Sequence, residues 1–215
     1  MSTRSSPPVR NVAAAKRSSP NAGRDVEPRR IYRLHVELLE ITPTIWRRLR
    51  VPSWITLAKL HLVFQAALGW TNSHLHQFEI ARTDYGIPDD DWPELALVDD
   101  RGVTLATAVG SSVTDFRYDY DFGDGWGHAI HVEGIEPVDE HLRYPLCIAG
   151  ANACPPEDVG GTGGYADFLQ AIRDRRHPEH ENYLRWCGGA FDPSGFDLNA
   201  INASLRRLRI PLRRS

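Results

Sequence analysis

Side chains able to hold a metal ion occur in three separated segments of this 215-residue chain. His74 and His76 form the first group, and on an extended strand their imidazoles share one face, roughly 6 to 7 Å apart at Cβ. Two imidazoles at that separation can reach one ion, but two ligands do not complete a coordination shell. We therefore expect further ligands from other parts of the chain.

A predicted hairpin turn and a long loop offer those further ligands. Asp121 lies at the turn, His128 lies on the strand that follows, and Cys154 lies in the loop. A mixed set of nitrogen, oxygen and sulfur ligands favours Zn²⁺. The candidate metal ligands are His74, His76, Asp121, His128 and Cys154. The alternative is that the histidines form hydrogen bonds inside a packed polar seam.

The same segments contain candidate acids, bases and a nucleophile. Carboxylates crowded with an imidazole at one turn are where pKa values separate for acid and base work. A thiol with a nearby histidine base is a candidate nucleophile. The candidate catalytic residues are Asp124, Glu157, Asp158 and Cys154. The structural alternative is a tight turn in which Gly123 and Gly125 supply positive φ, beside a loop that only holds the fold.

A run of glycines and a threonine at 160–164 precedes a predicted helix. Backbone N–H groups at a helix start can bind an anion. The run lacks the Gly-Lys-Ser/Thr ending of a phosphate-binding P-loop. Anion binding is therefore a weaker hypothesis here than a structural loop.

The spacing of apolar residues predicts the elements that position these side chains. A period of two residues predicts strands, and a period of three to four predicts helices. The predicted strands are 31–38, 45–51, 74–82 and the two arms of a hairpin at 116–122 and 126–132. The predicted helices are 57–68, 165–172, 179–186 and a last helix opened by Asp192 and Pro193. Residues 137–164 are predicted to be a long loop without a strand.

These elements predict an α+β fold, with an antiparallel sheet and its hairpins packed against about four helices. The chain is long enough for one core, so we expect a single domain over residues 29–210. Residues 1–28 are rich in Ser, Pro and Arg and have no apolar period, which predicts a disordered basic arm. Residues 211–215 form a short basic tail.

Charge is distributed unevenly along the chain. Residues 1–30 carry a net charge of +5, residues 206–215 carry +5, and the overall charge of −3 leaves −13 on the segment between them. An acidic body repels phosphates, so we expect nucleic acid to bind weakly at most, and through the basic tails. No segment has the length of a membrane span or a signal core, and three cysteines are too few for a disulfide framework, which predicts a cytoplasmic protein without a membrane partner.

Several motifs together resemble the plasmid pRiA4b ORF-three-like family. The motifs are residues 45–48, 69–70, 74–78, 118–128, 154–165, 191–193 and 196–197. The resemblance covers about residues 31 to 208 and implies an α+β fold and a microbial setting that is often a mobile element. It implies no established activity. Some relatives carry a transposon resolvase label, but we find no nucleophilic serine in an arginine-lined fold here.

Two classes of function remain open after these observations. The first is a binding or accessory module, with a metal site where His74, His76, the turn at 121–128 and the loop at 154–158 meet. Its rival is a metal-dependent hydrolase that uses the same residues, which would need an open coordination position. A third hypothesis is a nucleic-acid-associated accessory protein of a mobile element.

Overall fold

The computed structural model describes residues 29–88 and 96–210. The predicted disordered arm at 1–28 and the basic tail at 211–215 lie outside the described residues. Among the helices that the structure describes, none is long and apolar enough to cross a membrane.

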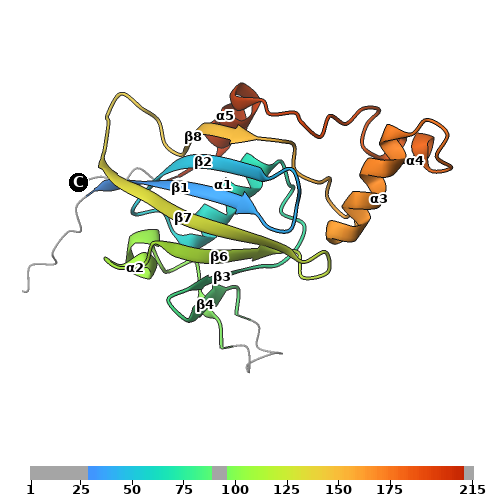
Figure 1. Cartoon of the computed structure of the whole chain (residues 1–215). Coiled ribbons are helices and arrows are strands. Elements are labelled where there is room, and N and C mark those ends of the chain that lie inside the picture. The colour runs from blue at the N-terminus through green and yellow to red at the C-terminus, as the bar shows by residue number, and fades with distance from the viewer. Residues whose placement is uncertain (1–28, 89–95, 211–215) are drawn as a thin grey trace, which may run out of the picture.

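An eight-stranded sheet forms the centre of the fold, with the order β5-β4-β3-β6-β7-β1-β2-β8 (Figure 1). Its strands are β1 (Arg30–Leu38), β2 (Ile45–Pro52), β3 (His76–Ile80), β4 (Thr83–Gly86), β5 (Val98–Asp99), β6 (Asp115–Tyr120), β7 (Trp126–Pro137) and β8 (Leu146–Ala151). Neighbouring strands pair antiparallel except for the short parallel pair of β4 and β5. The predicted α+β class is confirmed.

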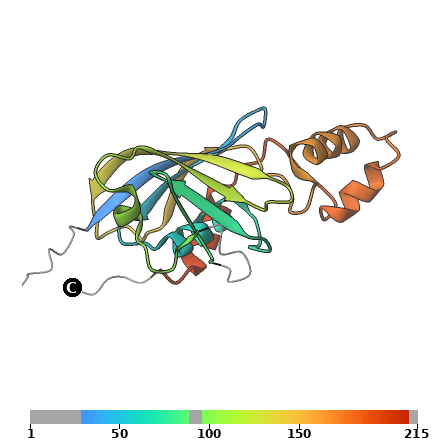
Figure 2. The ribbon, with the colours of Figure 1, turned by 90° about the horizontal axis from the view of Figure 1, so that it is seen from below.

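Helices cover one face of this sheet and extend beyond one end of it. The helices are α1 (Leu57–Leu68), α2 (Leu105–Val109), α3 (Gly161–Arg173), α4 (His180–Trp186) and α5 (Leu198–Arg207). Figure 2 shows α1 and α5 beneath the curved sheet, and α3 with α4 as a separate lobe beside it. The described residues thus contain five helices, where the sequence predicted about four.

The alternation of β1 explains how the sheet acquires a core face. Leu34, Val36 and Leu38 are buried, whereas Arg33 and His35 between them are partly exposed. A strand sends successive side chains to opposite faces, so this alternation buries one face against the helices and leaves the other in contact with water. The antiparallel pairing of β1 with β2 continues the same two faces.

Helix α1 begins and ends where its sequence predicts. The Thr56 side chain accepts a hydrogen bond from the Lys59 N–H, which satisfies one unpaired donor at the helix start. Gly69 ends the helix with a φ of 91°, a left-handed conformation that glycine adopts without a steric penalty. Leu57, Leu60 and Phe64 are fully buried under the sheet.

Three local predictions are corrected by the structure. The last helix does not start at Asp192, whose backbone and side chain instead close a turn with Ser194 and Gly195. Helix α5 starts later, where the Asp197 carboxylate accepts hydrogen bonds from the N–H groups of residues 199 and 200. The supposed loop at 137–164 contains the edge strand β8, and His74 lies before β3 rather than on it.

Candidate metal centre

The first candidate ligand, His74, lies in the short segment that joins α1 to β3. Hydrogen bonds hold this segment against β6: the Ser73 N–H donates to the Tyr120 hydroxyl, and the Asp121 N–H donates to the Leu75 carbonyl. The imidazole packs edge-on to the Tyr120 ring, with 5.9 Å between ring centroids. Its Nε2 atom therefore faces the turn between β6 and β7.

Asp121 opens that turn and presents a carboxylate to His74. Its Oδ1 atom accepts hydrogen bonds from the N–H groups of Gly123 and Asp124, which fixes the side chain. Its Oδ2 atom lies 3.6 Å from His74 Nε2. The φ angle of Asp121 is 55°, a left-handed value that aspartate tolerates better than most residues because its side chain bonds to nearby backbone.

The loop before α3 supplies two more carboxylates. Asp158 places Oδ1 2.8 Å from His74 Nε2, and Glu157 places Oε1 3.9 Å from the same nitrogen. Glu157 is fixed on both oxygens, since Tyr120 donates to Oε1 at 2.5 Å while the N–H and hydroxyl of Thr71 donate to Oε2. Asp158 is the most exposed of the three carboxylates, with 67% of its side chain accessible to solvent.

One imidazole and three carboxylates therefore meet at the end of the β6 and β7 hairpin. The ligand atoms of His74, Asp121 and Asp158 lie within 4.8 Å of one another. An ion with bonds of about 2.1 Å in tetrahedral geometry holds its ligand atoms about 3.4 Å apart. These contacts bring the His74 segment, the hairpin turn and the long loop together, while binding of an ion there stays a prediction.

His76 lies apart from this group because it enters the core. Its Nε2 atom is 2.8 Å from Oδ2 of the fully buried Asp100, and its ring stacks on His61 with 3.6 Å between centroids. The His61 ring in turn contacts the Tyr118 hydroxyl and the Asn72 side chain. Burial, followed by the charge of His76, lowers the pKa of His61 to about 4. These residues form the polar seam that was the alternative to ligation.

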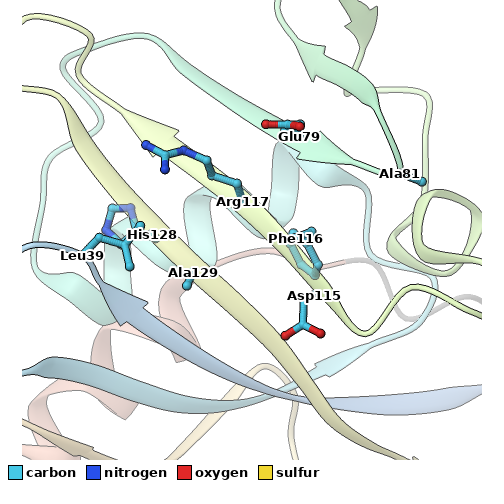
Figure 3. A pocket seen from close by; sticks show the side chains of 8 residues that line it. All are labelled: Leu39, Glu79, Ala81, Asp115, Phe116, Arg117, His128 and Ala129. Carbon is cyan, nitrogen blue, oxygen red and sulfur yellow. The ribbon is translucent and has the colours of Figure 1, made fainter.

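His128 also lies inside the fold. It contributes to the lining of a hollow of about 360 Å³ over β3, β6 and β7 (Figure 3), but its own side chain is fully buried. Its Nδ1 atom lies 3.1 Å from the Tyr118 carbonyl, which requires an N–H at that position. Its Nε2 atom has no hydrogen-bond partner within the described part of the chain. Burial lowers its pKa to about 4, so the imidazole is neutral.

Cys154 lies against a buried arginine. Its Sγ atom is 3.6 Å from Arg47 Nη2. The other two guanidinium nitrogens of Arg47 donate to the carbonyls of Trp46, Ala67 and Ala151. Burial raises the pKa of the Cys154 thiol to about 11, so the group remains a thiol near neutral pH. A thiol is a poor nucleophile and a poor metal ligand.

Asp124 joins the turn to the lobe formed by α3 and α4. Its Oδ2 atom accepts a hydrogen bond from the N–H of Gly160, at the start of α3. A Cβ on Gly161 would lie 2.5 Å from the Asp124 carbonyl, so only glycine permits this approach. The carboxylate thus occupies the helix start that the glycine run suggested for an external anion.

Tyr120 and Thr71 were missed as site residues. Both hold Glu157, and Tyr120 also positions the His74 segment. The hairpin alternation places Tyr120 on the buried face, where a hydroxyl needs a partner, and that requirement was the available signal. No pattern in the sequence pointed to Thr71.

This architecture defines an α+β protein in which a hairpin turn, a helix-to-strand segment and a loop bring one imidazole together with carboxylates. The chain belongs to the family described as plasmid pRiA4b ORF-3-like protein, whose family model matches residues 30–200. The family resemblance found in the motifs is therefore confirmed.

Two relatives show how widely this architecture extends. The uncharacterized protein y4hQ of Sinorhizobium fredii (strain NBRC 101917 / NGR234) is 40% identical over 177 residues, which cover 81% of this chain and 90% of the relative. The crystal structure of the protein of unknown function MM3350 from Methanosarcina mazei Go1 matches with a TM-score of 0.73 and 36% identity, over 80% of this chain and 97% of that chain.

Proposed function

We propose that this chain is an accessory module that binds one divalent metal ion through His74, Asp121 and Asp158, with Glu157 as a further oxygen ligand. The observation that carries the proposal is the approach of these ligand atoms to within 4.8 Å of one another. Three separate elements contribute them, so an ion would join the hairpin turn to the loop that leads into α3.

Charge supports a cation at this position. Asp121, Glu157 and Asp158 surround a single imidazole, and carboxylates this close together repel one another. A protonated His74 supplies one positive charge at most, whereas a divalent ion supplies two and accepts lone pairs from every ligand. The same atoms that form the contacts to His74 Nε2 would then bind the ion.

The ligand types point to a transition metal. One imidazole nitrogen with carboxylate oxygens suits Zn²⁺ and Mn²⁺ better than Ca²⁺, which prefers six to eight oxygen ligands. The general affinity order places Zn²⁺ well above Mn²⁺ for such a site. We therefore propose that Zn²⁺ binds this site more tightly than Mn²⁺ or Ca²⁺.

Calorimetric titration of chelator-treated full-length protein with ZnCl₂ and MnCl₂ tests this proposal. We expect one site per chain, with zinc bound more tightly than manganese. Asp121→Asn and His74→Ala should each weaken zinc binding by at least about 10- to 100-fold, the loss typical of supporting residues, since the first removes the charge of a ligand and the second removes a ligand. Zinc at about 100 times its Kd should also raise Tm by roughly 5 to 10 °C.

A second histidine and aspartate pair provides the matched control. His131 Nδ1 lies 2.7 Å from Asp115 Oδ1, and 52% of the His131 side chain is exposed. His131→Ala should leave zinc binding unchanged. Equal losses in His131→Ala and His74→Ala, or no zinc binding by the unmodified chain, would overturn the proposal.

A metal-dependent hydrolase is the second candidate, favoured by the uneven exposure of the cluster. Asp121 and Glu157 enclose it with side chains only 9% and 18% exposed, while Asp158 and His74 face solvent. An ion held from one side keeps water ligands on the other, which a catalytic metal requires. Hydrolysis of p-nitrophenyl esters or phosphates by zinc-loaded protein, with loss of this activity in His74→Ala, would establish this function. Zinc binding without hydrolysis would favour the accessory module instead.

A further inference from the structure

A cavity of about 410 Å³ lies at the opposite end of β7 from the candidate metal centre. Strand β7 starts beside the hairpin turn and ends at Pro137, after twelve residues. Twelve strand residues span roughly 36 Å, so the two regions are well separated. In Figure 1 this end of the sheet lies away from α3 and α4.

Apolar and aromatic side chains form most of the cavity wall. The apolar residues are Pro52, Val138, Leu142, Leu208 and Ile210. Trp54 and Tyr144 add aromatic rings. A concave, mostly apolar site of about 300 to 1,000 Å³ with a few polar groups is the usual form of a small-molecule site. This cavity meets that description in both size and lining.

Guanidinium groups give the cavity a positive side. Arg29 and Arg143 line it, against one carboxylate, Glu140. The Arg29 guanidinium lies over the Trp54 ring at 4.8 Å from its centroid, and its contact with Glu140 is a long 3.9 Å between exposed side chains. Arg143 is held in place by a hydrogen bond from Nη2 to the carbonyl of Arg206.

The surrounding chain strengthens this positive field. Arg206, Arg207 and Arg209 lie in the same segment as the wall residues Leu208 and Ile210. A pocket with low-dielectric walls concentrates such a field and attracts oppositely charged ligands. Guanidinium groups pair well with carboxylates.

We propose that this cavity binds a small amphipathic anion, namely a carboxylate with an apolar chain or ring. The apolar part lies between Trp54, Leu142 and Ile210, and the carboxylate lies at the side formed by Arg29 and Arg143. The site is independent of the metal centre and needs no metal ion.

Calorimetric titration of the full-length protein with decanoate, decanol and decylamine tests this inference. The three probes share one apolar chain and differ in the charge of the head group. Decanoate should bind one molecule per chain, at least about tenfold more tightly than decylamine, since opposite charges attract and like charges repel at the same site. Decanol should fall between them.

Two variants locate the binding. Leu142→Trp fills the cavity from an exposed loop and should abolish decanoate binding, while Arg143→Gln should weaken it about two- to fivefold, the effect of one partly exposed ion pair. Arg175→Gln, which removes an exposed arginine from the connection between α3 and α4, is the matched control and should change nothing. Unchanged Tm values would show that the variants fold.

Three results would overturn the inference. The first is equal affinity for decanoate and decylamine, which would mean that charge plays no part. The second is binding that persists in Leu142→Trp with a folded protein, which would place the ligand elsewhere. Absence of decanoate binding to the unmodified chain would also reject it.

Discussion

At the scale of single residues, three histidines predicted as metal ligands have different environments. His74 meets carboxylates at the protein surface, His76 pairs with Asp100 in the core, and His128 is enclosed between strands. His74 and His76 differ because β3 begins at His76: His74, two residues earlier, does not share the strand face that carries His76 inward. Two-residue spacing alone therefore did not determine which imidazole is available to an ion.

The Tyr120 hydroxyl should affect metal affinity without touching the ion. It donates to Glu157 and accepts from the Ser73 N–H, so Tyr120→Phe releases a carboxylate and loosens the His74 segment. Loss of such supporting contacts typically costs about 10- to 100-fold in metal affinity. We expect a loss of about tenfold in a zinc titration, with Tyr85→Phe unchanged as the control. Equal zinc affinity in both variants would contradict the supporting role of Tyr120.

The buried imidazoles of His61 and His128 should make the fold less stable in acid. Both pKa values are lowered to about 4, chiefly by burial, whereas an unfolded histidine titrates near 6.5. As the pH falls from about 6.5 to 4, the unfolded chain therefore binds protons that the folded chain does not, and stability decreases. By pH 5 each imidazole should remove about 2 kcal/mol from the free energy of unfolding.

Nitrogen-15 NMR of the histidine side chains checks this directly. At pH 5 we expect His61 and His128 to remain neutral in the folded protein and to be protonated in the same chain unfolded by urea. Protonated imidazoles in the folded state at pH 5 would be the opposite result.

At the scale of elements, the edge strand β8 is protected by a side chain from α5. The Asn202 amide accepts a hydrogen bond from the Cys147 N–H and donates one to the Cys147 carbonyl, each at 2.9 Å. These two bonds replace those that a further strand would make, and free strand edges promote aggregation. Helix α5 thus closes one side of the sheet.

Asn202→Ala should expose this edge. Two buried backbone groups lose their partner, which costs about 1 to 3 kcal/mol in the free energy of unfolding. Urea unfolding measures the loss, and light scattering on heating should show earlier aggregation than in the unmodified chain. Asn199→Ala, an exposed position of the same helix, is the control. Equal stability of the two variants would show that the edge bonds contribute nothing.

Elements with a clear period were predictable from the sequence, and elements without one were not. The hairpin of β6 and β7 and the capped helix α1 follow directly from alternation and from Thr56 and Gly69. Strand β8 has the sequence Leu-Cys-Ile-Ala-Gly-Ala, which has no alternation of polar and apolar residues to mark it as a strand. The meeting of His74 with Asp158 depends on long-range packing of the 154–160 loop, which no local pattern encodes.

At the scale of the whole molecule, charge is separated along the sequence between the central segment and the two ends of the chain. Residues 31–205 carry −13, while the first 30 and the last ten residues carry +5 each. A segment with this net charge repels phosphates, and the Debye length of about 8 Å at physiological salt limits how far that repulsion reaches. We therefore expect any nucleic acid to contact the positively charged ends of the chain.

Removal of residues 1–28 should weaken any DNA binding. The full chain should bind random DNA weakly and without sequence preference, with an affinity that falls steeply as salt rises, because released counterions drive the binding. Fluorescence anisotropy at low and moderate salt, on random DNA and on plasmid-derived DNA, compares the full and the shortened chain. Sequence-specific binding that survives the truncation would instead favour a role on the DNA of a mobile element.

The ion proposed here would connect the sheet to the lobe of α3 and α4. His74 and Asp121 belong to the sheet end, and Asp158 lies two residues before Gly160, where α3 starts. Asp124 makes a second link through its bond to the Gly160 N–H. The proposed role as a metal-binding accessory module depends on this junction.

Anomalous diffraction at the zinc absorption edge, from crystals of the full chain soaked in ZnCl₂, tests that junction most directly. We expect one strong peak per chain, about 2.1 Å from His74 Nε2 and from a carboxylate oxygen of both Asp121 and Asp158. A peak at other residues, or no peak at a zinc concentration that saturates the protein in solution, would contradict it.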